Sequence, residues 1–234
     1  MQHPPDSPTT AAQDDAALWQ VEAARYALLR RLAYAMRHHM VVHLQPIGMV
    51  TEVMDRRLRA GQPDIAQVRE GMDKINGFSR AAVQSCLEVV SWLAPGAASA
   101  IALDEGVLEC LAMVRSNFNF RGFSLRDEVQ GTACGVDRAG LRHVLPACLL
   151  ALTDHAQLPG VVVVCARVQP GQVELTLAME PAPGARGFHA DEPYRLMSWA
   201  EVQALAQAEQ MGLVREGSTI RIALPLLPAG SPAA

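Results

Sequence analysis

Two long stretches of helical periodicity, separated by a break at Gly61–Pro63, constrain the fold of this 234-residue chain more than any other feature. Apolar residues recur every three or four positions, which places them on one face of an α-helix. The first stripe, between residues 14 and 60, consists of Leu29, Leu32, Met36, Met40, Leu44, Ile47, Val50, Met54 and Leu58. The second, between residues 64 and 93, consists of Ile65, Val68, Met72, Ile75, Phe78, Ala82, Cys86, Val89 and Trp92. The sequence therefore predicts an antiparallel helical hairpin over residues 14–93.

The two stripes together are larger than one hairpin can bury. Two hairpins from two chains can form a four-helix bundle in which both stripes share one core. We therefore expect a homodimer that forms through residues 14–93.

Three histidines, His38, His39 and His43, lie midway along the first predicted helix. At about 100° per residue, His38 lies roughly 160° from Met40, which is near the centre of the apolar stripe. His39 and His43 flank the stripe at about −100° and −60°. His38 is thus predicted to be an exposed imidazole and a candidate phosphoryl acceptor, whereas packing is the simpler role for the other two. His39 is also a candidate for orienting the site through a hydrogen bond.

A second set of residues shares the predicted outward face with His38. Val42, Gln45 and Met49 follow it at i+4, i+7 and i+11, so they form what we call the outward stripe. Exposed apolar residues beside a reactive group often mark a partner-binding surface. The alternative is that the second helix or the rest of the chain covers this stripe.

The second half of the chain has a different pattern of predicted elements. Ala94–Ser99 has the composition of a linker, and we expect the linker to extend over residues 94–103. Beyond it, the pattern predicts helices at 104–117, 137–156 and 198–211, and strands at 123–129, 160–168, 172–180, 213–216 and 219–225. Helices that alternate with hairpins indicate an α+β sandwich with one helical layer over residues 104–226.

Composition excludes several classes of function. A net charge of −4 and a pI near 6.0 argue against a nucleic-acid-binding protein, and the arginines at positions 25, 30, 31 and 37 are interpreted as a solvated helix face. The five cysteines are scattered, and the N-terminal sequence lacks the pattern of a signal peptide, so a cytoplasmic location with reduced thiols is expected. No apolar run reaches the length that a membrane span needs.

Two further expectations concern the chain ends and metals. Residues 1–13 are predicted to be a disordered leader, and residues 227–234 a tail. His143 and His155 are twelve residues apart, so they do not form a metal-binding pair on one helix face, and no metal site is predicted.

The order of these parts resembles a bacterial sensor histidine kinase without its sensor, over nearly all of residues 14–226. In that family the phosphoacceptor histidine is followed six residues later by a core leucine, and His38 and Leu44 match this spacing. His39 stands where the kinases usually carry an acid, Val41 and Val42 replace polar residues, and His43 replaces a frequent proline or asparagine.

The second domain resembles the ATP-binding domain of the kinases but departs from it at the residues that hold the nucleotide. The family's two magnesium-holding asparagines correspond to Ala147 and Ala151, and an alanine methyl group cannot ligate a hard cation. The adenine-binding box D-x-G-x-G corresponds to Glu180–Gly184, which keeps only the last glycine, and residues 185–212 show no glycine-rich lid. The resemblance therefore implies a degenerate domain that binds no ATP and no other cofactor.

What remains resembles the ChpT-type histidine phosphotransferases, which are dimers with a kinase-like bundle and a degenerate ATP-binding domain. This resemblance implies an ATP-independent enzyme that passes a phosphoryl group between the aspartates of response-regulator receiver domains, one of which can belong to a hybrid histidine kinase. The alternative is a non-catalytic pseudokinase that binds and modulates a kinase or a response regulator. A divergent ATP-dependent kinase and an anti-sigma-like binding protein are less favoured alternatives.

Overall fold

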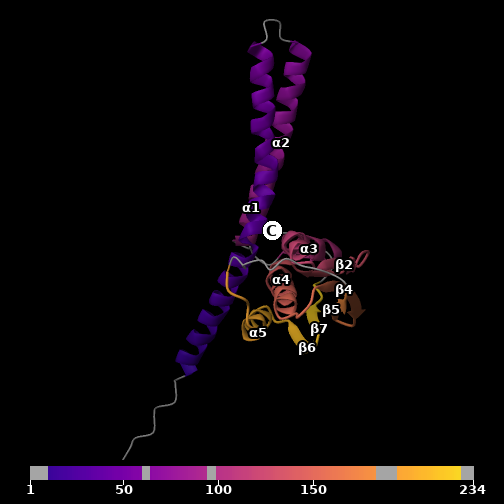
Figure 1. Ribbon diagram of the computed structural model, residues 1–234. Helices are drawn as coiled ribbons and strands as arrows, with labels where there is room; N and C mark the ends of the chain where they lie inside the picture. The colour runs from indigo at the N-terminus through magenta and orange to yellow at the C-terminus, as the bar shows by residue number, and fades with distance from the viewer. Residues whose placement is uncertain (1–9, 60–63, 94–98, 183–193, 228–234) are drawn as a thin grey trace, which may run out of the picture. The chain divides into compact units, whose positions relative to one another are not determined.

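The computed structural model describes residues 10–59, 64–93, 99–182 and 194–227, which belong to two compact units (Figure 1). We call residues 33–96 the hairpin unit, and residues 97–234 together with the chain up to Leu32 the α/β unit. Helix α1, Thr10–Arg59, contributes to both units, because the division lies inside it. The predicted range 14–93 therefore does not coincide with one unit. Residues 10–13, predicted as part of a disordered leader, are helical, and residues 1–9 lie outside the described residues.

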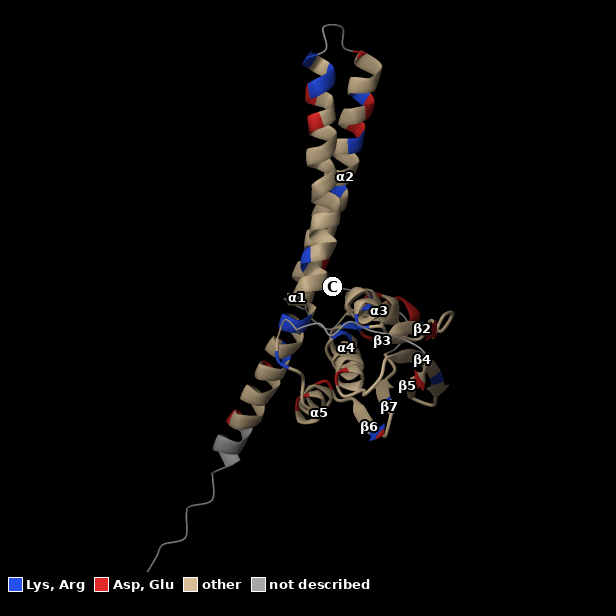
Figure 2. Cartoon of the chain, in the orientation of Figure 1, with Lys and Arg blue, Asp and Glu red and all other residues tan. Residues whose placement is uncertain are grey.

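The hairpin unit consists of α1 from Ala33 onward and α2, Ile65–Leu93, which confirms the predicted pair of helices. The carboxylate of Asp64 accepts a hydrogen bond from the Ala66 backbone N–H at 2.9 Å, so it satisfies a free donor in the first turn of α2. Gly71 marks a close approach of the helices: a Cβ atom there would lie 2.1 Å from Met54 Sδ. Charged side chains gather toward the ends joined by residues 60–63, whereas the middle of the hairpin carries few (Figure 2).

The α/β unit contains a five-stranded sheet with one layer of helices on one of its faces, which confirms the predicted α+β class (Figure 1). In spatial order the strands are β2 (Ser124–Glu128), β4 (Gly160–Gln169), β5 (Gln172–Pro181), β7 (Thr219–Pro225) and β6 (Gly212–Glu216). β2 and β4 are parallel, and all other neighbouring strands in this sheet are antiparallel. The helices are α3 (Leu103–Phe120), α4 (Arg138–Asp154) and α5 (Trp199–Ala208).

Local sequence signals explain most of these elements. In β5, Val173, Leu175 and Leu177 alternate with polar or small residues and are fully buried, because successive strand side chains point to opposite faces. Gly171 adopts φ +78° in the turn between β4 and β5, a conformation that a side chain would strain. The carboxylate of Asp137 caps α4 by accepting a 2.7 Å hydrogen bond from the Gly140 N–H.

Two short strands were not predicted. β1, Ala100–Ala102, and β3, Gly135–Asp137, pair with each other in an antiparallel two-stranded sheet. β1 and the first residue of α3 lie within residues 94–103, so the predicted linker ends earlier than expected. Three-residue strands are too short to show an alternating pattern, and their pairing joins segments more than thirty residues apart.

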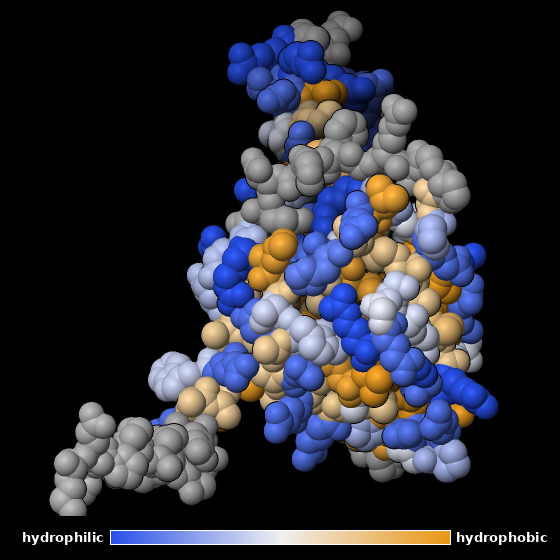
Figure 3. Space-filling view, turned by 60° about the horizontal axis from the view of Figure 1, so that its bottom comes forward, coloured by the Kyte–Doolittle hydropathy of each residue, from blue (hydrophilic) through white to orange (hydrophobic). Residues whose placement is uncertain are grey.

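Hydrophilic side chains cover much of one face of the α/β unit (Figure 3). The face shown in Figure 3 is dominated by hydrophilic side chains, with hydrophobic ones scattered among them. The residues predicted as the tail lie outside the described residues except for Leu227, whose N–H donates a 2.9 Å hydrogen bond to the Gly135 carbonyl.

Candidate functional site

The three neighbouring histidines of α1 differ in exposure. His38 is exposed, whereas His39 and His43 are half-buried. These exposures follow the helical phase, because His38 lies on the side of α1 opposite the apolar stripe. The α-helix holds the His38 backbone rigidly and leaves the ring accessible to a partner.

An arginine and a tyrosine stand beside His38 on the same helix. The guanidinium of Arg37 lies 5.2 Å from the ring centroid of Tyr34, within the range of a cation–π contact. Tyr34 is itself 55% exposed. Arg37 therefore adds a positive charge to the exposed surface of the helix that carries His38, which favours the approach of an anionic group.

The outward stripe is open to solvent. Val42 is 46% exposed, Met49 is 62% exposed, and Gln45 is also exposed. No described residue covers these side chains, so the stripe presents two apolar groups and one amide on the helix that carries His38.

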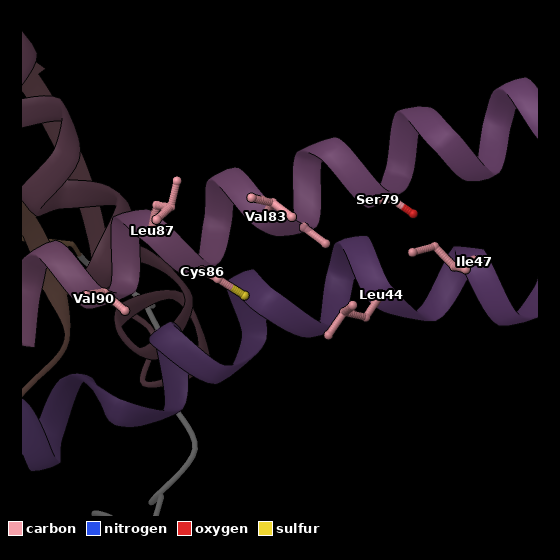
Figure 4. A pocket seen from close by; sticks show the side chains of 8 residues that line it. Leu44, Ile47, Ser79, Val83, Cys86, Leu87 and Val90 are labelled. Carbon is pink, nitrogen blue, oxygen red and sulfur yellow. The ribbon is translucent and has the colours of Figure 1, made fainter.

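A separate apolar groove runs between the two helices of the hairpin unit. It has a volume of about 390 Å³ and is lined from both helices by apolar residues and one serine (Figure 4). The lining residues are Leu44, Ile47, Ser79, Ala82, Val83, Cys86, Leu87 and Val90. Leu44, which the sequence placed on the apolar stripe, is 50% exposed because nothing among the described residues fills the groove.

The positions at which the resemblance expects magnesium ligands lie inside the α/β unit. Ala147 and Ala151 are both fully buried in α4, and neither carries an oxygen that could bind a cation. Among the described residues, no three His, Cys, Asp or Glu side chains are grouped closely enough to hold a metal ion. The segment expected to carry the adenine box and the lid covers residues 180–212, and residues 183–193 of it lie outside the described residues.

A buried ion pair ties the part of α1 before Ala33 to the rest of the α/β unit. The Arg31 guanidinium donates two hydrogen bonds to the Asp154 carboxylate, at 2.7 and 2.8 Å, and these two side chains are 1% and 0% exposed. Arg121 Nη1 lies 3.1 Å from the same carboxylate. The interpretation of Arg31 as part of a solvated helix face is therefore wrong: the side chain is buried because Asp154 lies beneath it.

A second polar cluster lies at the other end of α4. The carboxylate of Glu209 is 2.8 Å from His143 Nδ1 and accepts a 3.0 Å hydrogen bond from Arg25 of α1. The hydrogen bond with His143, followed by that from Arg25, holds the pKa of Glu209 below its ordinary value, although burial acts in the opposite direction.

Sequence reasoning did not single out Arg31, Asp154 or Glu209. The apolar spacing of α1 continues through Ala24, Ala27 and Leu28, which are fully or almost fully buried, but spacing identifies an apolar face and not its partner. Arg31 lies within that buried face, between Leu28 and Leu32, which is the one available signal that it is not solvated.

No protein-family model matches the sequence, and no curated protein does either. Among solved structures, the chain is similar to the histidine kinase AdeS of Acinetobacter baumannii, with 13% identity and a TM-score of 0.42 over 77% of this chain and 96% of that one. A histidine kinase from Burkholderia phymatum is 17% identical, with a TM-score of 0.43 over 84% of this chain and 98% of that one. The mycobacterial sensor histidine kinase MprB is 20% identical, with a TM-score of 0.41 over 56% and 99%. Likenesses at this level do not assign an activity to the chain.

None of the described helices combines the length and the apolar character that crossing a membrane requires.

Proposed function

We propose that this chain is a histidine phosphotransferase of a two-component phosphorelay, which passes a phosphoryl group between receiver-domain aspartates through His38 and does not use ATP. The observation that carries the proposal is the exposed imidazole of His38 on a rigid helix, next to an open apolar stripe. Neither His39 nor His43 offers the same access, since both rings are half-buried.

The transfer reaction requires only one reactive group from this chain, the His38 imidazole. A nitrogen of the neutral His38 imidazole attacks the phosphorus of an aspartyl phosphate in line, so that an N–P bond forms as the P–O bond to the aspartate breaks. The aspartate leaves as a carboxylate. In the second half of the cycle a carboxylate of another receiver attacks the same phosphorus, and the imidazole leaves. The receiver supplies the magnesium ion that neutralises the phosphoryl oxygens.

The α/β unit supports the part of the proposal that excludes ATP. The resemblance to the kinases assigns Ala147 and Ala151 to the positions of the two magnesium ligands; both carry only a methyl group, and both are buried.

We also propose that the protein acts as a homodimer through the hairpin unit. The groove between α1 and α2 exposes Val83, Leu87 and Val90, which are 55–60% exposed. A second hairpin with the same apolar face is the occupant that matches this lining, and burying each large side chain contributes about 1.5–3 kcal/mol.

The test is phosphoryl transfer from a panel of receiver domains that carry a radiolabelled aspartyl phosphate. We expect the wild-type chain to acquire acid-labile label and to pass it to a second receiver. His38→Ala should reduce labelling at least a hundredfold with an unchanged circular dichroism spectrum, whereas His39→Ala, the matched control, should still accept label. Transfer by His38→Ala at the wild-type rate would overturn the proposal.

A second arm separates the phosphotransferase from the alternatives. Incubation with magnesium and labelled ATP should leave the chain unlabelled, and autophosphorylation would instead indicate a kinase. A chain that binds receivers but acquires no label from any of them would be a non-catalytic binding protein.

A further inference from the structure

Residues 25–31 of α1 are attached to the rest of the α/β unit at three separate points. Arg31 pairs with Asp154 at the C-terminal end of α4, and Arg25 pairs with Glu209 after α5. Between them, the Tyr26 ring packs edge-on against the ring of Tyr194, with centroids 6.0 Å apart. The Arg30 guanidinium lies 5.3 Å from the centroid of the same Tyr194 ring. One short stretch of helix thus binds three different elements of the unit.

Two of these attachments mark the ends of a single face of α4. His143, which contacts Glu209, and Asp154 are eleven residues apart, so they lie within about 20° of each other on the helix. Ala147 and Leu150 fall on the same line between them, and Ala151 flanks it. Ala147 and Ala151 are 0% exposed and Leu150 is 2% exposed, so this face is covered along its length.

The stretch of α1 between Arg25 and Arg31 and beside it also carries buried small and apolar residues. Ala24 and Ala27 are 0% exposed, and Leu28 and Leu32 are 1% exposed. Small residues such as Ala24, Ala27, Ala147 and Ala151 are the kind that permit close helix packing, and the charge pairs of Arg25 and Arg31 fix how this stretch of α1 lies along α4.

We propose that residues 24–32 of α1 form an intramolecular strap that covers the Ala147 face of α4 and closes it to small-molecule ligands. The Arg31–Asp154 pair supplies the buried polar contact that holds the strap. Once this pair breaks, the strap opens as a unit of its own, before the sheet of the α/β unit unfolds. A magnesium-bound nucleotide is then excluded from this face by a helix as well as by the missing oxygen ligands. This inference does not depend on phosphoryl transfer by His38.

Hydrogen exchange of the full-length chain, followed by mass spectrometry, tests the strap with two matched substitutions. Arg31→Gln removes the buried pair, and Arg30→Gln removes the same charge from the adjacent exposed position. We expect Arg31→Gln to speed exchange in residues 24–32 at least tenfold and to leave the β5 amides within twofold of wild type. Arg30→Gln should speed exchange in residues 24–32 less than threefold.

A thiol at the covered face gives a second measurement. In the Ala147→Cys chain, labelling of the introduced thiol reports exposure of the face, and Cys110 is the internal reference because it is fully buried between α3 and α4. We expect the introduced thiol to be labelled faster than Cys110. Adding Arg31→Gln should increase the ratio of these two labelling rates at least tenfold. Magnesium and ATP should not slow the labelling.

Each result decides the proposal. Equal acceleration of residues 24–32 and β5 by Arg31→Gln would show that α1 is an inseparable part of the core and would overturn the strap. Unchanged exchange in residues 24–32 would show that the pair does not hold it. Protection of the introduced thiol by magnesium and ATP would show that the face is open to nucleotide. If the Ala147→Cys chain does not fold, the hydrogen-exchange measurement alone tests the strap.

Discussion

The two units differ in how completely they bury their own apolar residues. In the α/β unit the strands and the helical layer share a core with many fully buried side chains, among them Leu145, Leu177 and Leu205. Among the described residues of the hairpin unit, none of the buried hydrophobic ones is fully buried; they are Ala35, Met36, Met54, Ala82, Val89 and Trp92. The same unit exposes a larger set, which includes Val83, Leu87 and Val90 beside the groove.

This difference distinguishes a unit that buries its apolar residues within one chain from the unit that we propose to form the homodimer. A protein surface seldom leaves a long apolar groove open unless another molecule covers it. The part of α1 up to Leu32 belongs to the α/β unit and buries Ala27 and Leu28 there, whereas the continuation of the same helix leaves Leu44 half-exposed. One helix therefore contributes to a closed core in its first part and to an open surface in its second.

The largest expected effect is on stability. Leu177→Ala removes a fully buried side chain in β5 and should lower the free energy of unfolding by about 2–5 kcal/mol. Leu44→Ala should cost less than about 1 kcal/mol at concentrations low enough to keep the chain monomeric, because its side chain is 50% exposed. Chemical denaturation measures both. Equal costs would show that the hairpin unit is as well packed as the α/β unit.

The next effect concerns self-association. Val83→Glu combined with Leu87→Glu places charges in the apolar groove and should weaken the homodimer about a hundredfold, or roughly 2.7 kcal/mol. Val214→Glu is the matched control, because this valine is 52% exposed in the α/β unit. Light scattering over a dilution series measures the association. A wild-type chain that stays monomeric at micromolar concentration would contradict the prediction.

A smaller effect is expected at the outward stripe. Val42→Glu should slow phosphoryl transfer from a receiver about tenfold, because a charge replaces an apolar contact at the docking surface. The change should alter the free energy of unfolding by less than about 0.5 kcal/mol, since the side chain is exposed. Val168→Glu, at another exposed valine, is the control for added charge. An unfolded variant would place Val42 in a core, and normal transfer would move the docking surface elsewhere.

The smallest effect is on the pH dependence of the α/β unit. The pKa of Glu209 is lowered in the folded state by His143 and Arg25, so its ionised form stabilises the fold. This contribution is present above the ordinary pKa of about 4.5 and is lost as the pH falls through the folded-state value. Glu209→Gln should therefore cost about 1 kcal/mol at pH 7 and progressively less below pH 4.5. Unfolding curves at several pH values measure this, and a cost independent of pH would rule out the ionised carboxylate as its source.

Sequence reasoning predicted the elements that have a strong local signal. The valine run at 161–164 and the turn at Gly171 define β4 and β5, and the apolar spacing defines α2 to within a residue or two. It missed β1 and β3, which pair with each other although α3 and β2 lie between them in the sequence. It also missed the burial of Arg31, since its partner Asp154 lies 123 residues away and only the fold brings the two together.

For the candidate site, helical phase alone was enough to rank the exposure of the three histidines. It could not say whether the outward stripe would be covered, because that depends on how other elements pack against α1. The exposure of Val42 and Met49 is therefore information that the structure adds.

The order of the strands bears on how copies of this protein stay apart at high concentration. The two outer strands of the described sheet, β2 and β6, are only five residues long, and both carry charged side chains: Arg126, Asp127 and Glu128 in one, Arg215 and Glu216 in the other. Short, charged edge strands disfavour the pairing of one sheet with another, which is the route to fibrous aggregates. Chains crowded together in a cell or a concentrated sample therefore have little tendency to join strand to strand, even though each has an open apolar surface between its helices.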